Sequence, residues 1–338
     1  GRAWQGAPIW ITVEGANIMT RCLMIFGQGA IRCHPYVLKE MAASRLPDSN
    51  QALKEFDRLL FSHIGYSISN AVRSFFLGFS RGHLARVPVP NDRRLASYYR
   101  KLTRYSAALA FTADVSMLTL GGKLKQKERL SARLGDVLSQ LYICSAMLKR
   151  YEAQGRPATD QPILAWAFHD AVYKIQTALG GAVDNFPNRY MRFLLSLVIF
   201  PTGRREREPG DRLSHRVAQL LLSPSETRDR LTQGVYKSAA TGHPVGMMEE
   251  ALPLVIAAEP LERKLLKAQR AGQLDAITWD EQLQQAVNLS VVTAEEAKTL
   301  RDVRERVLEI IAVDEFESEV LELGKPAKKE PIRTSEAA

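Results

Sequence analysis

The sequence predicts an all-α protein, on three observations. Apolar residues recur at intervals of three and four along most of the chain, and no stretch alternates apolar and polar residues like a run of β-strands. Short segments rich in proline and glycine divide this pattern into separate helices. Hydrophobic residues make up 46% of the 338 residues, which is enough for a sizeable buried core and argues against wholesale disorder.

The first two thirds of the chain contain six expected helices. Their ranges are 14–41 (interrupted at His34-Pro35), 52–77, 94–120, 123–151, 162–183 and 188–200. Breaks at 46–48 and 87–91 contain proline. Gly121-Gly122 ends the third helix, and two long helices joined this closely should pack antiparallel, as in a helical bundle.

Two of these helices carry the clearest apolar stripes. In 52–77 the stripe consists of Phe56, Leu59, Leu60, Ile64, Ile68, Val72, Phe75 and Phe76. In 123–151 the residues expected to face inward are Leu130, Leu134, Val137, Leu138, Leu141 and Leu148. Both stripes follow helical spacing, so both segments should be amphipathic helices.

Residues 201–211 are charged and contain proline and glycine, and they mark the best internal boundary. Shorter helices are expected beyond it, over 212–222, 246–271, 278–287 and 293–311. Thr293 and Glu296 have the spacing of a capping box at the start of the last helix. Residues 314–338 are charged, include two prolines and are expected to form a loosely ordered tail.

The bulk properties limit the function classes. The net charge of +9 and the pI near 9.5 permit attraction to phosphates, anionic lipid heads or a CoA-like ligand, but no recognised nucleic-acid-binding motif accompanies the charge. The three cysteines, Cys22, Cys33 and Cys144, lack metal-like spacing and are expected to be reduced thiols. No signal peptide is visible, and the longest apolar stretch, 193–201, has half the length of a membrane span.

The segment 5–21, QGAPIWITVEGANIMTR, is the richest in candidate chemistry. An extended stretch leads into Glu14 and Gly15 and then into a helix. A carboxylate at a helix start, beside a glycine that lets a ligand approach backbone N–H groups, is a plausible site. An ordinary glutamate at the N-terminus of a helix is the commoner explanation of the same pattern.

The run Glu14-Gly15-Ala16-Asn17-Ile18 followed by Arg21 resembles the EGT-x-x-I-Q-R signature of acyl-CoA dehydrogenases. The wider sequence is similar to the bacterial fatty-acid-oxidation (FadE-type) branch of that family. The similar segments are RAWQGAPIWITVEGANIMTRCLMIFGQGAIRCHPYVLKEM, LGGKLKQKERLSARLGDVLSQLY, NFPNR, VIFPTGR and HPVGMMEEAL, which occur in the same order. The start at Gly1, inside what reads as a structured segment, fits a C-terminal fragment of such an enzyme.

The resemblance implies roles for three residues. Glu14 matches the base that removes the α-proton of the acyl-CoA, while Gly15 fits close approach of the backbone to the substrate. Such a base must be held against the proton and away from water. Ala16 stands in the cofactor-binding part of the signature, where a threonine or serine is usual, so any contact to the flavin through that hydroxyl is absent. Arg2 and Arg21 are expected to be structural ion-pair partners, and no metal ligand is expected.

The resemblance also implies the organisation of the chain. Residues 1–48 would end the catalytic domain of the dehydrogenase, and 49–203 would form the helical bundle of an extra C-terminal α domain. Residues 204–313 would add further short helices of that domain, and 314–338 the tail. The family's flavin-covering β-domain is missing, so this portion by itself should not hold FAD or turn over substrate.

The function implied is that of an FAD-dependent enzyme of fatty-acid β-oxidation, oxidising medium- or long-chain acyl-CoA to trans-2-enoyl-CoA and passing electrons to an electron-transferring flavoprotein. The alternative is a non-catalytic helical module for membrane association or oligomer assembly. The expected location is the cytoplasm, with peripheral contact to the inner membrane as an option, and the expected assembly is a homo-oligomer. No nucleic-acid partner is expected.

The remaining candidates have structural explanations that compete with functional ones. The basic face 123–133 is expected to be solvated. Segment 189–205 has the composition of an interfacial membrane helix, and burial in a bundle explains it equally well. The six histidines look scattered, without metal-ligand spacing. Asp114, Asp136 and Asp170 are expected to be partners of arginines rather than catalytic acids.

Overall fold

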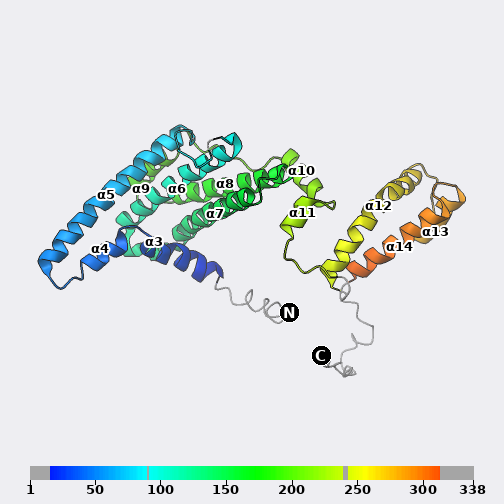
Figure 1. Cartoon of the computed structure of the whole chain (residues 1–338), viewed down its shortest axis with the longest axis horizontal. Coiled ribbons are helices and arrows are strands. Elements are labelled where there is room, and N and C mark those ends of the chain that lie inside the picture. Colours follow the sequence, from blue (N-terminus) through cyan, green and yellow to red (C-terminus); the bar gives the residue numbers. More distant parts are fainter. Residues whose placement is uncertain (1–15, 90, 239–242, 313–338) are drawn as a thin grey trace, which may run out of the picture. The chain divides into compact units, whose positions relative to one another are not determined.

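The computed structural model describes residues 16–89, 91–238 and 243–312. Over these residues the chain is helical without a β-strand, which confirms the all-α prediction (Figure 1). Two compact units are present, one up to Ala218 and one from Gln219 onward. The helices of the first unit are η1 (Ala16–Gln28, a π-helix), α3 (Gly29–Arg32), α4 (Val37–Ala43), α5 (Ser49–Phe79), α6 (Arg93–Leu120), η2 (Gly121–Gln126, 3-10), α7 (Glu128–Ala153), η3 (Ala158–Asp160, 3-10), α8 (Gln161–Asp184), α9 (Arg189–Ile199) and most of α10 (Asp211–Leu221).

Helices α5, α6 and α9 each begin where a polar side chain caps the first turn. The side chain of Asp48 accepts a hydrogen bond from the Asn50 backbone N–H at the start of α5. Asp92 does the same for α6, and Asn188 for α9. Each cap satisfies backbone N–H groups that have no partner inside the helix, which stabilises a helix by about 1 kcal/mol. The caps place the helix starts within a few residues of the predicted ones.

Helices α6 and α7 are antiparallel, as the two-glycine connection predicted. Gly121 ends α6 with a φ of 50°, a left-handed conformation that favours glycine. Near the first turns of α6, the Tyr99 hydroxyl donates to Glu152 Oε1 at 2.9 Å, close to the last turn of α7. Burial together with this hydrogen bond raises the pKa of Tyr99 to about 12. The sequence did not indicate that a 3-10 helix, η2, fills the connection.

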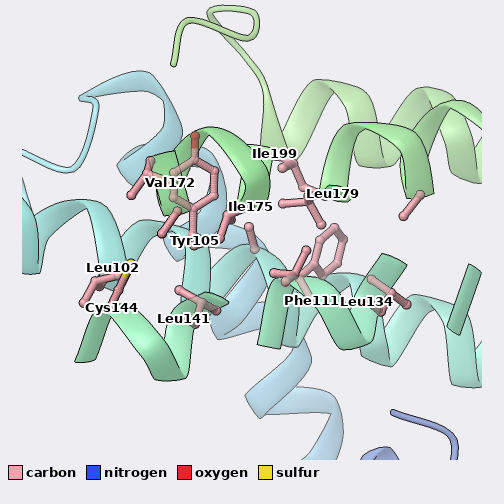
Figure 2. Packing of buried hydrophobic residues seen from close by; sticks show 14 of the residues in the cluster. Leu102, Tyr105, Phe111, Leu134, Leu141, Cys144, Val172, Ile175, Leu179 and Ile199 are labelled. Atoms are coloured by element: carbon pink, nitrogen blue, oxygen red, sulfur yellow. The ribbon is translucent and has the colours of Figure 1, made fainter. Parts of the chain in front are cut away.

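The core of the first unit lies between α6, α7 and α8 (Figure 2). Leu134, Ile175 and Leu179 are fully buried there, and the ring of Phe168 stacks on Tyr98 with centroids 4.2 Å apart. Of the residues of α7 that were predicted to face inward, all are buried except Leu138, which is exposed. The buried face of α7 was therefore predicted correctly, except that Leu138 was wrongly included.

The apolar stripe predicted on α5 is largely exposed within this unit. Only Leu59 of that stripe is buried, whereas Ile64, Ile68, Val72 and Phe76 are exposed. The helix instead buries the small or polar residues Asn70, Ser74 and Gly78, together with Leu59 and Leu77. A Cβ atom on Gly78 would lie 2.9 Å from the Pro201 ring, so the small residue permits close packing there.

The predicted boundary, residues 201–211, lies within the first unit, where Arg204 and Glu206 pack on α8. The Glu206 backbone N–H donates to Gln176 Oε1 at 2.9 Å, and Gln176 Nε2 donates back to the Glu206 carbonyl oxygen at 3.0 Å. Arg204 forms an ion pair with Asp184 of α8, which lowers the pKa of Asp184. These contacts hold the charged segment against α8, and the two compact units divide only after Ala218.

The second unit contains α11 (Glu226–Leu231), α12 (Pro244–Arg270), α13 (Trp279–Asn288) and α14 (Ala294–Ile311), with the end of α10. Its own core includes Ala258, Leu283 and Leu300. The predicted capping box at Thr293 is present, and Thr278 forms a second one. The short helix α11 was not predicted. The expected tail, 314–338, lies outside the described residues.

Candidate functional site

The three residues that the signature singles out are only partly described. Glu14 and Gly15 lie outside the described residues, and Ala16 begins η1. The roles assigned to them therefore stay predictions. The structure does describe how the helix that follows them is held.

Helix η1 is fixed to the N-terminal half of α7. Arg21 Nε donates to Asp136 Oδ1 at 2.7 Å and Arg21 Nη2 donates to Asp136 Oδ2 at 2.5 Å, so the guanidinium grips both carboxylate oxygens. The hydrogen bond raises the pKa of Arg21. Beside this pair, a Cβ atom on Gly135 would lie 3.0 Å from the Arg21 carbonyl oxygen, so the two helices approach closely. The prediction that Arg21 and Asp136 are structural ion-pair partners is confirmed.

Two of the histidines meet at a buried carboxylate, contrary to the expectation that they are scattered. His34 Nε2 lies 2.9 Å from Asp114 Oδ1, and His63 Nε2 lies 3.8 Å from the same oxygen. The Ser67 hydroxyl donates to Asp114 Oδ2 at 2.7 Å, and His63 Nδ1 lies 2.9 Å from Glu40 Oε1. We call these five residues, His34, Glu40, His63, Ser67 and Asp114, the histidine–carboxylate cluster. The prediction that Asp114 pairs with an arginine is wrong.

The sequence could not reveal this cluster because its members come from separate elements. His34 follows α3, Glu40 lies in α4, His63 in α5 and Asp114 in α6. His34 and Asp114 are 80 residues apart in sequence. Only the packing of α4 and α5 on α6 brings them together. A mid-helix aspartate flanked by apolar residues was the available signal, and by itself it does not name a partner.

The hydrogen bonds define what the cluster can do. The ligand atoms of His34, His63 and Asp114 lie within 4.8 Å of one another, close enough for a metal ion. However, His34 Nδ1 accepts hydrogen bonds from the backbone N–H groups of Tyr36 and Val37, both at 3.2 Å. That nitrogen therefore carries the lone pair, and Nε2 carries the proton that it donates to Asp114. A metal ion at Nε2 would have to displace that proton, so the hydrogen bonds favour a network that ties α4 to α5 and α6.

An apolar cavity of about 670 Å³ borders the cluster between α5, α6 and α9. Its polar end is formed by cluster members Glu40, His63, Ser67 and Asp114. Ile64, Ile68, Leu118 and Leu194, which also line it, are exposed. The cavity is thus an open apolar groove that ends at a buried polar network.

The other predicted candidates have structural roles. Asp170 accepts from Lys174 Nζ at 2.7 Å, one helical turn along α8, so its partner is a lysine instead of the predicted arginine. On the basic face 123–133, Lys123, Lys125, Lys127 and Arg129 are exposed, as predicted for a solvated surface, whereas Arg133 is half-buried and lies against Gly181 of α8.

The cysteines and α9 also match or refine the predictions. All three cysteines are free, as predicted, and burial raises the pKa of the Cys144 thiol to about 12. Helix α9 is partly buried in the bundle, through Leu195 and Ile199, and partly exposed, through Phe193 and Leu197. The predicted burial therefore holds for one face, and contact of the exposed face with a membrane stays a prediction.

A family model described as the C-terminal domain of bacterial-type acyl-CoA dehydrogenases matches residues 31–316. This chain belongs to that family. The match covers most of the chain and both compact units, and it agrees with the resemblance found in the sequence. No solved structure matches the chain.

Within this acyl-CoA dehydrogenase C-terminal domain, the matched residues include the whole histidine–carboxylate cluster. The match begins after Arg21, so the predicted base Glu14 precedes the matched segment. Among the helices that the structure describes, none has both the length and the apolar character that a membrane crossing requires.

Proposed function

We propose that this chain is the C-terminal α-helical portion of an FAD-dependent acyl-CoA dehydrogenase of the FadE type. The enzyme would oxidise medium- or long-chain acyl-CoA to the trans-2-enoyl-CoA in β-oxidation and pass electrons to an electron-transferring flavoprotein. The observation that carries this proposal is the family match over residues 31–316. The order of the similar segments supports it, because they extend upstream of the match to the base-bearing signature.

Glu14 is proposed as the base that removes the α-proton of the acyl-CoA. Flavin bound in the enzyme would accept the hydride from the β-carbon. The structure supports a positioning role for the bundle, since the helix that starts two residues after Glu14 is held by the Arg21–Asp136 pair and the close contact at Gly135. A base works only when it is held against the proton that it removes.

The resemblance implies a β-domain that covers the flavin, and the described residues contain no β-strand. Alanine at position 16 supplies no hydroxyl for a hydrogen bond to the cofactor. Flavin binding is accordingly proposed for the longer enzyme only. This chain, purified alone, should be colourless, and a stoichiometric yellow flavin absorbance would contradict the proposal.

The test of the catalytic role is Glu14→Gln in the full-length enzyme. The substitution keeps the shape of the side chain and removes its basicity, so flavin absorbance should be unchanged while acyl-CoA-dependent reduction of an electron acceptor is lost. Glu305→Gln is the matched control, because Glu305 is an exposed glutamate of α14. Turnover by Glu14→Gln at the rate of the control would refute the assignment.

A second candidate function, association with a membrane or with another subunit, is favoured by the exposed apolar faces of α5 and α9. Phe76 and Phe79 near the end of α5 are 53% and 65% exposed, and Phe193 of α9 is 72% exposed. Large exposed apolar patches mark interaction surfaces. In the dehydrogenase this role would accompany catalysis rather than replace it.

The two forms of association separate in one set of measurements. Phe193→Asp should abolish co-sedimentation with anionic lipid vesicles if α9 inserts into a membrane. The same variant should lower the mass measured by light scattering if α9 joins two subunits. Tyr142→Asp is the matched control, since Tyr142 is about equally exposed but lies on α7, away from α5 and α9 in the sequence. Unchanged vesicle binding and unchanged mass in Phe193→Asp would exclude α9 as an interface.

A further inference from the structure

A second, strongly basic cavity of about 270 Å³ lies in the first unit, between the turn that follows α5, the N-terminal half of α6 and residues 202–206. Its charged lining consists of Arg81, Arg100, Lys101, Arg104, Arg205 and Glu206. Five cationic side chains therefore surround one carboxylate. The volume is close to the lower limit of about 300 Å³ for small-molecule sites, so the ligand that fits is small.

Glu206 accounts for two of the five cations. Its carboxylate lies 2.6 Å from Lys101 Nζ and 3.9 Å from Arg104 Nη1, and the reciprocal hydrogen bonds with Gln176 hold its backbone in place. Arg81, Arg100 and Arg205 form no ion pair with a carboxylate of the described residues. Three guanidinium groups around one small cavity therefore have no carboxylate partner among the described residues, although Arg205 Nε donates to the Thr202 carbonyl oxygen at 2.8 Å.

Arg100 gives the clearest sign that a partner is missing. Its Nε atom is buried and has no hydrogen-bond partner among the described residues. Buried donors are normally hydrogen-bonded because an unmade bond is costly.

The cavity is formed in advance by close backbone packing. Arg81 and Gly82 have φ values of 54° and 87°, a left-handed pair of residues that turns the chain sharply after α5. A Cβ atom on Gly82 would lie 2.9 Å from the Arg100 carbonyl oxygen, so the turn rests directly on α6. This contact holds Arg81 and Arg100 on the same cavity.

We propose that this cavity is a binding site for a phosphate-bearing anion, held by Arg81, Arg100 and Arg205. Guanidinium groups match phosphate oxygens with paired hydrogen bonds, and a tetrahedral oxyanion can accept from several of them at once. The ligand is either a soluble phosphate ester or the headgroup of a phospholipid, and both present the same phosphate to the same arginines.

This site is separate from the proposed dehydrogenase site. Helix η1, which follows Glu14, is anchored at Gly135 and Asp136, beside the C-terminal half of α6 in the antiparallel α6–α7 pair. Arg100 lies in the N-terminal half of α6. A test of the anion site is thus independent of a test of the role of Glu14.

The first test is isothermal titration of the whole chain with inorganic phosphate, with chloride at matched ionic strength as the reference. We expect saturable phosphate binding that Arg100→Gln and Arg205→Gln each weaken by about 10- to 150-fold, the loss of one hydrogen-bonded charge. Arg93→Gln is the matched control, since Arg93 is exposed on the same helix and does not line the cavity. If Arg100→Gln shows a reduced helical circular dichroism signal, its effect on binding cannot be separated from unfolding. The phosphate affinity of Arg205→Gln, which lies on an exposed segment, is then the deciding measurement.

The second test separates the two sources of phosphate, with vesicles of phosphatidylcholine alone or mixed with phosphatidic acid. Binding only to the mixed vesicles, lost in Arg100→Gln and competed by free phosphate, would identify a lipid headgroup. Phosphate binding in solution without vesicle binding would identify a soluble ester. The proposal is overturned if neither phosphate nor phosphatidic acid binds above its reference, or if Arg93→Gln weakens binding as much as the two cavity variants do.

Discussion

Removal of the Asp114 carboxylate should strongly destabilise the first unit. The Asp114 side chain is 7% exposed, accepts from His34 Nε2 at 2.9 Å and from the Ser67 hydroxyl at 2.7 Å, and faces His63. In Asp114→Ala the buried His34 donor and the half-buried Ser67 donor lose their acceptor. Hydrogen bonds to a charged group contribute about 1.5–3 kcal/mol each, so two of them give about 3–6 kcal/mol.

Two effects reduce this figure. The alanine variant no longer buries a carboxylate, and the bordering apolar groove is open enough to admit water to the freed donors. We therefore expect a net loss of about 2–4 kcal/mol for Asp114→Ala. Asp114→Asn keeps one acceptor oxygen for His34 and should cost about 1 kcal/mol. Asp170→Ala, which removes a single surface pair with Lys174, should cost under about 0.5 kcal/mol.

Amide hydrogen exchange in α6 is the suitable assay, because the chain has two compact units and a single global transition is not assured. The expected loss corresponds to exchange about 30- to 700-fold faster in Asp114→Ala. Zn²⁺ should not slow exchange in the unmodified chain, since His34 Nε2 carries a proton. Equal exchange rates in Asp114→Ala and Asp170→Ala, or strong protection by Zn²⁺, would refute the hydrogen-bond account of the cluster.

Three further predictions follow from the packing, the pKa shifts and the caps. Burial and the charge of Lys101 lower the pKa of His169, so the unfolded state binds a proton at a higher pH than the folded state does. The free energy of unfolding should therefore fall as the pH drops below about 6.5. His169→Gln should flatten this pH dependence when unfolding is measured from pH 8 to 5. Phe168→Ala removes a fully buried ring stacked on Tyr98 and should cost about 3–5 kcal/mol in urea unfolding; a loss under about 1 kcal/mol would show a poorly packed core. Thr293→Ala should cost about 1 kcal/mol and speed exchange in α14 alone, whereas faster exchange in α6 would show that the two units unfold together.

Local features were predictable wherever neighbouring residues decide them. The capping box at Thr293, the helix stop at Gly121 and the breaks near the prolines all arise from side chains that act on the backbone within a few residues. The α7 stripe was also largely predictable, since all of its residues except the exposed Leu138 are buried in the core.

Features that depend on which helix surfaces pack against each other in the tertiary structure were not predictable from the sequence. The α5 stripe has helical periodicity, but Asn70, Ser74 and Gly78 on another face allow closer packing, so the apolar stripe stays exposed in this unit. The charged residues 201–210 have the composition of a linker, and only Gln176 and Asp184, on α8, reveal that they pack on the first unit.

The sequence by itself determined the helical class, most helix boundaries and, through the ordered resemblance, the family that the match over 31–316 supports. Only the tertiary structure brought His34, His63 and Asp114 together and gathered Arg81, Arg100 and Arg205 around one cavity. The physical reason is the range of the interactions. Helix periodicity and caps act over a few residues, whereas hydrogen bonds and charges act between atoms that are close in space, however far apart they stand in the chain.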